Sequence, residues 1–282
     1  MQGSRGPRSL LPTCTCARLA HLRTSAERDS VKSQFAWLRR SAWCTATALP
    51  LLAQAAAPPQ WQYSGEYGPA QWGRMQPAYA QCDRGRRQSP IDIVATRKQP
   101  LPALEFQYRS APLRIVNDGH TVRVRFANGS RMLLGRDSHT LQQFHFHVPG
   151  GDRVHGEEFL MSMHFLHKSN SGRLVSLVVL FRLGAENAAL AALLPNMPAR
   201  GQAERTVPNL YVDPAQLLPA AHGYYAYEGS LTAPPCTEGV LWIVMQQPLE
   251  LSAAQLARLG QMFPPNARPV QPMHDRVVTE SP

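Results

Sequence analysis

The chain has 282 residues, of which 44% are hydrophobic and 17% are charged, which is enough for one domain with a substantial core. Its formal net charge is +10, but the first 57 residues hold eight basic and two acidic side chains, so the rest carries only +4. No cluster of Lys and Arg with interleaved aromatic residues is present, and we therefore expect no nucleic-acid partner.

Residues 32–57 have the pattern of a secretory signal peptide. A basic segment with Lys32, Arg39 and Arg40 precedes an apolar stretch at residues 41–52. This stretch is too short to cross a bilayer as a helix. We therefore expect export of the chain and no stable membrane span.

The signal peptide sets the expected domain boundaries. Runs of small residues that end at Ala55 and at Ala57 both fit a cleavage site. The residues before the signal show no periodicity, and one explanation is that translation starts at Val31. We expect an N-terminal extension and signal peptide at 1–57, a single domain at 58–282, and a periplasmic or secreted mature protein.

Most of the domain has strand patterns. Residues Thr121–Phe126 alternate between apolar and polar, and Asn128-Gly129 then predicts a hairpin turn before Arg131–Leu134. The segments Leu174–Leu183 and Val240–Gln246 are almost continuously apolar, which predicts central strands. The fold class is thus mainly β.

Helix signals are few and short. A helix is predicted at Glu186–Leu194, where Pro195 ends it. Asp213 followed by Pro214 is typical of an N-cap and a first helical residue. Ser252 and Gln255 fit a capping box, which predicts a helix that ends near residue 262.

Two histidines on one strand face suggest a binding site. His145 and His147 are two residues apart in a strand-like segment, so their side chains point to the same face. Phe144, Phe146 and Val148 then point to the other face. Taken alone, the two histidines could equally be exposed polar residues.

A third histidine can join them. In the strand-like segment Phe159–His167, the side chains of Ser162, His164 and Leu166 share one face. If this strand pairs antiparallel with the first, His164 completes a set of three imidazoles, which is the ligand set of a catalytic zinc site with one open position. His167 lies on the opposite face and is the weaker alternative, and His164 could also be an ordinary core histidine.

Several separate segments match one family in order and spacing. They are Trp61–Tyr63, Gly68–Gly73, Gln88–Ile93, Asn117–His120, the strands with the three histidines, Tyr227–Gly239, Trp242–Val244, Asn266–Pro272 and Arg276. Over residues 61–277 the chain resembles the alpha-class carbonic anhydrases, particularly the bacterial secreted type. The resemblance implies a single domain around a large, twisted, ten-stranded, mostly antiparallel sheet with the metal at the base of a central cleft.

The resemblance also implies a role for individual residues. A Zn²⁺ ion would lie on the three histidines, His120 would be the proton shuttle, and Thr232 would orient the attacking hydroxide. Tyr63 would belong to an ordered-water network. The apolar wall for carbon dioxide would be Leu166, Leu231, Val240 and Trp242, and the residues that support the ligands would be Gln143, Ser162 and Asn266. The apolar four could instead be ordinary core, and His120 could merely fill a turn.

Cysteine usage agrees with export. Only Cys82 and Cys236 lie outside the leader, an even number that suits one disulfide in an oxidising compartment. The resembled family pairs these two positions. The alternative is a pair of buried free thiols.

Three positions depart from the family pattern. An ungapped comparison places Gly151 where the family has a glutamate that binds the threonine hydroxyl, although the adjacent Asp152 could serve. Ser162 replaces a glutamate that supports the third histidine, and Ser176 replaces a valine of the pocket.

The expected function is the zinc-dependent conversion of carbon dioxide and water to bicarbonate and a proton. A non-catalytic binding module that keeps the fold, and a zinc esterase that uses the same hydroxide, are the alternatives. The sequence leaves open whether the protein is a homodimer.

Overall fold

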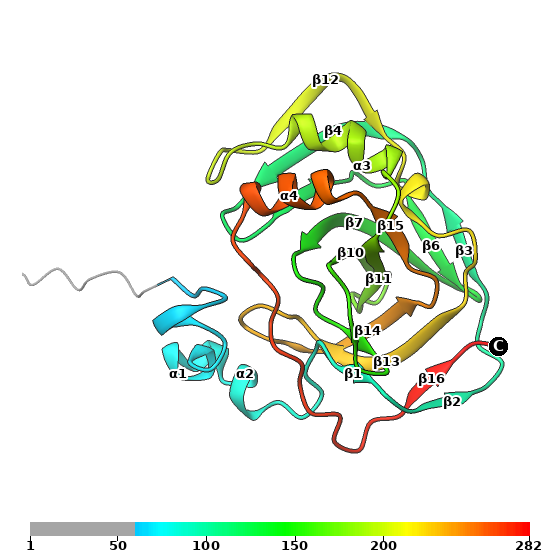
Figure 1. The fold of residues 1–282 in the computed structure, drawn as a ribbon. Coiled ribbons are helices and arrows are strands. Elements are labelled where there is room, and N and C mark those ends of the chain that lie inside the picture. The colour runs from blue at the N-terminus through cyan, green and yellow to red at the C-terminus, as the bar shows by residue number, and fades with distance from the viewer. Residues whose placement is uncertain (1–59) are drawn as a thin grey trace, which may run out of the picture. The chain divides into compact units, whose positions relative to one another are not determined.

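The structure is a computed structural model and describes residues 60–282. The expected signal peptide, its two cleavage sites and the candidate start at Val31 lie outside this range. Figure 1 shows the described residues as a large twisted sheet with a few short helices around it. None of the helices in this part of the chain has the length and the run of apolar residues that a transmembrane segment needs.

Within residues 60–282, thirteen strands form one sheet, and ten of them follow each other along a continuous path. In spatial order the ten are β12 (Arg205–Val212), β4 (Ala111–Asn117), β5 (Val122–Arg125), β7 (Asp137–His147), β10 (Met161–Ser169), β11 (Leu174–Leu183), β14 (Glu238–Met245), β13 (Tyr224–Ser230), β16 (Val278–Glu280) and β2 (Thr96–Lys98). Only β11–β14 and β16–β2 are parallel neighbours along this path. The expected mainly β, mostly antiparallel fold is confirmed.

The other strands lie beside this path. The strands β15 (Leu249–Leu251), β3 (Leu104–Gln107) and β6 (Arg131–Leu134) branch from it, while β1 (Asp92–Ile93), β8 (Arg153–Val154) and β9 (Glu157–Glu158) form a separate small sheet. The strands β8 and β9 lie in the connection between β7 and β10. Asp152, which is fully buried, comes directly before β8.

The turn predicted at Asn128-Gly129 is present, but the hairpin predicted around it does not form. The strands β5 and β6 do not pair with each other; both pair with β7, β5 near its end and β6 near its start. The hairpin lies one turn later, where Gly135 takes a positive φ of 61° between β6 and β7. The reason is the length of β7, whose eleven residues accept two short strands end to end.

The two central strands predicted from apolar runs are confirmed as β11 and β14. Both faces of the sheet are covered there. One face carries the main core, to which Phe144, Phe146 and Phe165 contribute, and the helices α3 (Ala188–Leu193) and α4 (Ala253–Met262) pack on it. The opposite face carries a smaller apolar cluster around Trp242.

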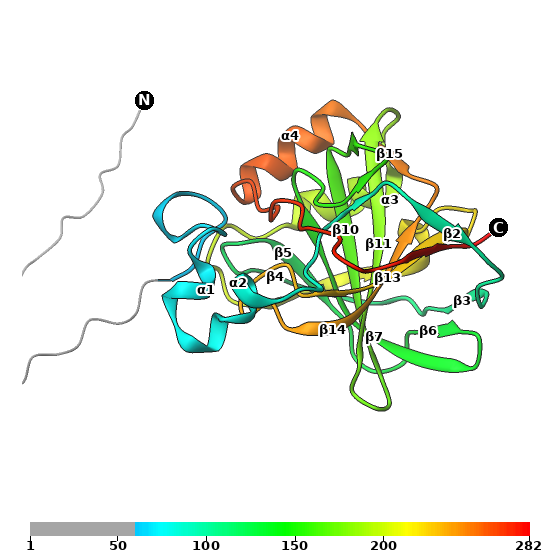
Figure 2. The same ribbon diagram turned by 90° about the horizontal axis from the view of Figure 1, so that it is seen from below.

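The helix signals are mostly confirmed. Ser252 and Gln255 form the predicted capping box of α4. Asp213 caps a short 3-10 helix, η4 (Pro214–Leu217). The helix α3 begins later than predicted because the Asn187 side chain accepts the N–H of Leu190 and so caps it. Figure 2 shows α3 and α4 on the same side of the sheet.

The N-terminal part of the domain contains short helices only. They are η1 (Gly65–Tyr67), α1 (Trp72–Met75), η2 (Pro77–Tyr79) and α2 (Gln81–Arg84), and η3 (Leu194–Asn196) follows α3 later in the chain. Trp72 is fully buried and packs against Cys82 and Cys236. This small cluster attaches the N-terminal segment to the loop between β13 and β14.

Candidate metal centre and active-site cleft

The pairing of β7 with β10 assembles the three histidines. The strands are antiparallel, with His145 opposite His164 and His147 opposite Ser162. Residues opposite each other in a ladder point to the same face. The Nε2 atoms of His145 and His147 lie 3.1 Å apart, and one ring nitrogen from each of the three histidines lies within 4.8 Å of the others.

Each histidine is held through its other ring nitrogen. Nδ1 of His145 lies 3.0 Å from Oε1 of Gln143, and Nδ1 of His147 lies 2.8 Å from the main-chain oxygen of Asn266. In His164 the two ring nitrogens exchange roles. Its Nε2 lies 3.1 Å from Oγ of Ser162, which leaves Nδ1 to face the other two histidines. Such contacts fix the ring orientation and the tautomer of metal-binding histidines.

The environment keeps the three imidazoles neutral. Burial lowers the pKa of His147 to about 4 and lowers the pKa of His145 and His164 well below the ordinary value. A neutral imidazole offers a lone pair to a metal ion, whereas an imidazolium does not. The set is therefore ready to bind a metal at neutral pH.

His167 is excluded from this set. Its Nε2 lies 2.7 Å from the Tyr108 hydroxyl, and its Nδ1 lies 3.0 Å from the carbonyl oxygen of Phe165, on the other face of the sheet. A bulge in β10 separates it from Leu166. It is a fully buried core histidine.

The three histidines line a cleft of about 280 Å³. Its apolar wall contains all four residues expected there, which are Leu166, Leu231, Val240 and Trp242, and Ser176 lies between two of them as the cross-strand partner of both Leu166 and Trp242. The polar side contains Gln143, Thr121 and Arg123. The cleft is thus apolar on one side of the histidines and polar on the other.

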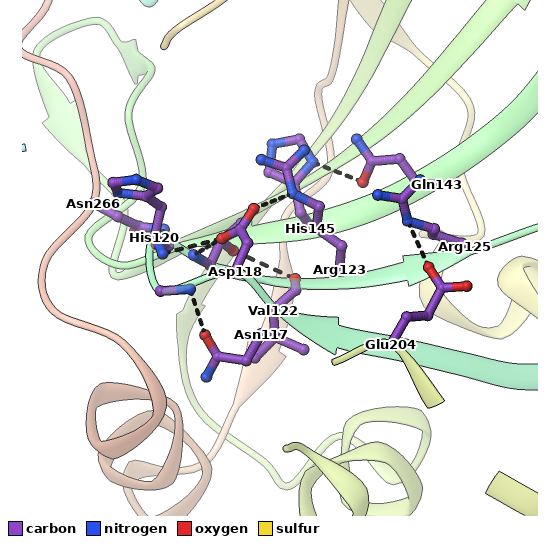
Figure 3. A network of polar contacts seen from close by, with 12 residues as sticks. Asn117, Asp118, His120, Val122, Arg123, Arg125, Gln143, His145, Glu204 and Asn266 are labelled. Atoms are coloured by element: carbon purple, nitrogen blue, oxygen red, sulfur yellow. Dashed lines mark hydrogen bonds and ion pairs between the residues drawn. The ribbon is translucent and has the colours of Figure 1, made fainter. Parts of the chain in front are cut away.

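His120 lies at the mouth of this cleft on a tight turn. The Asp118 carboxylate accepts the N–H groups of His120 and Thr121 at 3.0 and 2.9 Å, and the Asn117 amide oxygen accepts the N–H of Gly119 at 3.0 Å (Figure 3). The ring stacks on Trp61 with centroids 3.8 Å apart. Partial burial lowers its pKa, while the Asp118 carboxylate acts in the opposite direction.

Asn266 connects this turn to the histidine strand. Its amide nitrogen donates to the carbonyl oxygens of His120 and Phe146 at 2.9 and 2.8 Å, and its amide oxygen accepts the N–H of Val148. Together with the contact to His147, this fully buried residue fixes the shuttle candidate and one ligand candidate relative to each other. The sequence placed Asn266 near the site but did not predict these contacts.

Tyr63 lies between His120 and His147. Its ring centroid is 6.3 Å from each of the two imidazole rings, and both contacts are edge-to-face. Burial raises the pKa of its hydroxyl well above the ordinary value, so the group stays protonated. Tyr63 also packs on Trp72 beside the disulfide.

The loop that carries Thr232 is anchored from several sides. Cys236 forms a disulfide with Cys82. The carbonyl oxygen of Cys236 accepts Nε2 of Gln88 at 3.1 Å, and buried Arg268 donates to Oε1 of Gln88 at 2.7 Å. These contacts explain how an irregular loop can present a hydroxyl to the cleft in a fixed place.

The carboxylate of Asp152, the residue that the sequence offered as a partner for Thr232, is fully buried. Its Oδ1 accepts the hydroxyl of Tyr227 at 2.9 Å and the N–H of Ile91 at 3.3 Å, whereas its buried Oδ2 has no partner among the described residues. Burial raises the pKa of Asp152 to about 7. Gly151 instead packs against Pro90, whose Cγ would lie 3.1 Å from a Cβ atom at this position. Asp152 is therefore the buried carboxylate of this segment, but its hydrogen bonds go to Tyr227 and Ile91, and none joins it to Thr232.

Sequence reasoning missed two neighbours of the cleft. In the sequence, Trp61 is only part of a family motif, whereas in the structure its ring stacks on the His120 ring. In the sequence, Arg123 is only a polar residue of an alternating strand. In the structure it lies opposite His145 in the ladder and lines the cleft. The alternation did show that Arg123 points away from the core, but only the pairing of β5 with β7 shows what it faces.

Comparison with known proteins places this arrangement in one family. The family model described as eukaryotic-type carbonic anhydrase matches residues 67–282. A carbonic anhydrase of Nostoc sp. is 40% identical over 228 residues, which cover 78% of this chain and 86% of the relative. A carbonic anhydrase of Klebsiella pneumoniae is 42% identical over 224 residues, which cover 78% and 90%.

A solved structure gives the same answer for the fold. The alpha-carbonic anhydrase of Thermovibrio ammonificans, in complex with the inhibitor sulfanilamide, matches with a TM-score of 0.75 and 39% identity over 78% of this chain and 98% of that one. The chain belongs to the alpha-class carbonic anhydrases, and its activity is the hydration of carbon dioxide to bicarbonate and a proton.

Proposed function

We propose that this activity depends on a zinc ion held by His145, His147 and His164. The donor set supports the proposal, because three neutral imidazole nitrogens converge and each ring is fixed by a partner on its far side. Three histidines with one open position form the ligand set of a catalytic zinc site. When bound, zinc supplies hydroxide at neutral pH by lowering the pKa of water to about 7, a value established for carbonic anhydrase itself.

The apolar wall receives carbon dioxide. Leu166, Leu231 and Trp242 offer no hydrogen-bonding group to water on the side that faces the histidines, apart from the Trp242 N–H, which already donates to the Ser230 carbonyl at 3.0 Å. The transfer of a neutral apolar gas from water to such a surface lowers its free energy. The wall therefore positions carbon dioxide beside the attacking oxygen without binding it tightly.

Thr232 and Asp152 orient the attack. Thr232 lines the cleft and needs an acceptor for its own hydroxyl proton, which Asp152 or a water would supply. Oδ2 of Asp152 is buried and has no hydrogen-bond partner among residues 60–282, Thr232 included. If Thr232 donates its hydroxyl proton to this acceptor, the oxygen of Thr232 must itself accept, and it orients the attacking hydroxide toward carbon dioxide. Tyr63 holds ordered water between Thr232 and the cleft mouth.

His120 carries the released proton to solvent. An imidazole has an ordinary pKa near 6.5 and can therefore accept and release a proton near neutral pH. The ring lies at the cleft mouth, on a turn that Asp118 and Asn266 hold in place. Its stacking on Trp61 fixes the plane of the ring.

The protein acts after export to the periplasm or the exterior. The disulfide between Cys82 and Cys236 supports this proposal, because such bonds form and persist in oxidising compartments. Residues 1–57, with their signal-peptide pattern, support it independently. N-terminal sequencing of the exported protein tests it, since a mature chain that begins before Val31 would contradict it.

Stopped-flow measurement of carbon dioxide hydration, with and without a zinc chelator, tests the zinc proposal. We expect about one zinc per chain and loss of activity on chelation. His164→Ala should lose the metal and the activity, while His167→Ala, which removes a buried histidine of the same strand, should keep the metal. Full zinc occupancy in His164→Ala would overturn the ligand assignment.

A further inference from the structure

Arg123 carries the single formal charge among the residues that line the cleft in the described part of the chain, because the three clustered histidines are neutral. It lies opposite His145 in the ladder between β5 and β7. Side chains in this relation have Cβ atoms about 4.5–5.5 Å apart. Figure 3 shows the guanidinium group beside the His145 ring.

One edge of this guanidinium group is already occupied. Its Nε donates to Oδ2 of Asp118 at 2.6 Å, and Asp118 uses its other oxygen for the turn that carries His120. Burial alone would raise the pKa of Asp118, but the Arg123 charge and the turn N–H groups hold it below the ordinary value. The ion pair therefore persists at neutral pH, and it fixes the direction of the Arg123 side chain.

The other edge of the guanidinium group is free. Among residues 60–282, no acceptor hydrogen-bonds to the two terminal nitrogens of Arg123, and 32% of its side chain is exposed. Two adjacent N–H groups at the end of an oriented arginine match two oxygens of a planar oxyanion. They face a cleft whose product is such an anion.

A neighbouring arginine shows the contrasting arrangement. Arg125 lies two residues later on the same strand and the same face, but it pairs with Glu204 at 2.8 Å and does not line the cleft. Figure 3 shows both pairs side by side. The strand thus presents one arginine to the cleft and one to an acidic partner outside it.

We propose that Arg123 is a docking residue for small oxyanions, and that it binds bicarbonate through its terminal N–H groups as the anion enters or leaves the cleft. The inference deepens the proposed function, because bicarbonate is the product of that reaction. Asp118 acts through Arg123 as a positioning residue. Neutral carbon dioxide has no net charge for the guanidinium group to attract. Carbon dioxide therefore binds at the apolar wall, and bicarbonate binds at Arg123.

A purely structural role for Arg123 predicts something different. If the arginine only neutralised Asp118 and stabilised the His120 turn, its loss would lower stability and slow proton transfer without changing anion affinity. Anion affinity therefore separates the two roles. Nitrate is a suitable probe, since it is planar, carries one negative charge and is not turned over.

The test compares Arg123→Gln, Arg123→Lys and the matched control Arg125→Gln at constant ionic strength. We expect Arg123→Gln to weaken inhibition of carbon dioxide hydration by nitrate about tenfold, the size of one charge-assisted hydrogen-bonded contact. The nitrate inhibition constant of Arg123→Lys should lie between those of the wild type and Arg123→Gln, because lysine keeps the positive charge but lacks the two adjacent N–H groups. Arg125→Gln should leave the nitrate inhibition constant unchanged. An unchanged constant in Arg123→Gln, or an equal change in Arg125→Gln, would overturn the proposal.

A second readout does not depend on activity. In ¹H–¹⁵N spectra of arginine Nε–Hε groups, added bicarbonate should shift the Arg123 signal, identified by its absence in Arg123→Gln, and leave the Arg125 signal in place. Absence of that shift would overturn direct docking. If the wild-type protein hydrates no carbon dioxide but the Arg123 signal still responds to bicarbonate, the proposed function fails and the docking site stands.

Discussion

The hydroxyl of Ser162 lies 3.1 Å from Nε2 of His164, at the position where the family pattern has a carboxylate. A hydroxyl can accept the imidazole N–H and so still select the ring nitrogen that faces the cluster, but it adds no negative charge to raise ligand basicity. We expect Ser162→Ala to weaken zinc binding by roughly tenfold, measured by competition with a chelator. Ser176→Ala removes a hydroxyl that lines the same cleft but hydrogen-bonds to none of the three ligand candidates. An equal loss of affinity there would contradict this explanation.

Thr232 and Asp152 should act as one unit in catalysis. We expect Thr232→Val and Asp152→Asn each to lower kcat/KM by roughly 10–100-fold, because either change breaks the donor–acceptor chain that orients the hydroxide. The double variant should lose little more than either single one. Stopped-flow kinetics of the double-mutant cycle measures this coupling. Fully additive losses would show that Asp152 does not serve Thr232.

The buried carboxyl of Asp152 should make stability depend on pH. Its pKa is raised to about 7 in the folded protein, whereas an unfolded Asp titrates near 3.9. Stability from the protonated group is present below pH ~4 and is lost as pH rises through about 7. We expect wild type to lose up to a few kcal/mol relative to Asp152→Asn across this interval, measured by urea unfolding. A constant difference between the two proteins from pH 4 to 8 would contradict the raised pKa.

His120→Ala should slow turnover only where proton transfer limits it. We expect kcat in weak buffer to fall by roughly 100-fold and to recover partly on addition of imidazole, because the ring moves protons and does not attack carbon dioxide. kcat/KM should stay near the wild-type value. Stopped-flow assays across a buffer series measure both parameters, and an unchanged kcat at every buffer concentration would remove His120 from the shuttle role.

The disulfide should contribute strongly to stability. It joins positions 154 residues apart, and a closed loop of this size is worth roughly 4–5 kcal/mol in the chain-entropy model, as an upper value. We expect the double variant Cys82→Ala/Cys236→Ala to unfold at a clearly lower urea concentration, and to have lower activity because the Thr232 loop loses one of its anchors. Equal midpoints for this variant and the oxidised wild type would contradict the prediction.

Features with a local physical cause could be predicted from the sequence. The shared direction of His145 and His147 follows from the two-residue period of a strand, and the start of α4 follows from the Ser252–Gln255 capping box. The almost continuous apolar runs of β11 and β14 predicted buried central strands, because a strand that is covered on both faces needs apolar residues on both. In each case neighbouring residues along the chain are enough to decide the structure.

Features that depend on which segments meet were decided only by the tertiary structure. The alternation of β5 is the same whichever strand it pairs with. The sequence therefore predicts a hairpin around Asn128-Gly129 that does not form, and it does not show that Arg123 lies opposite His145. The neighbours of Gly151 and Asp152, which are Pro90 and Tyr227, likewise come from distant parts of the chain. The periodicity of a chain shows which way a side chain points, but the partner it meets depends on contacts between residues far apart in the sequence.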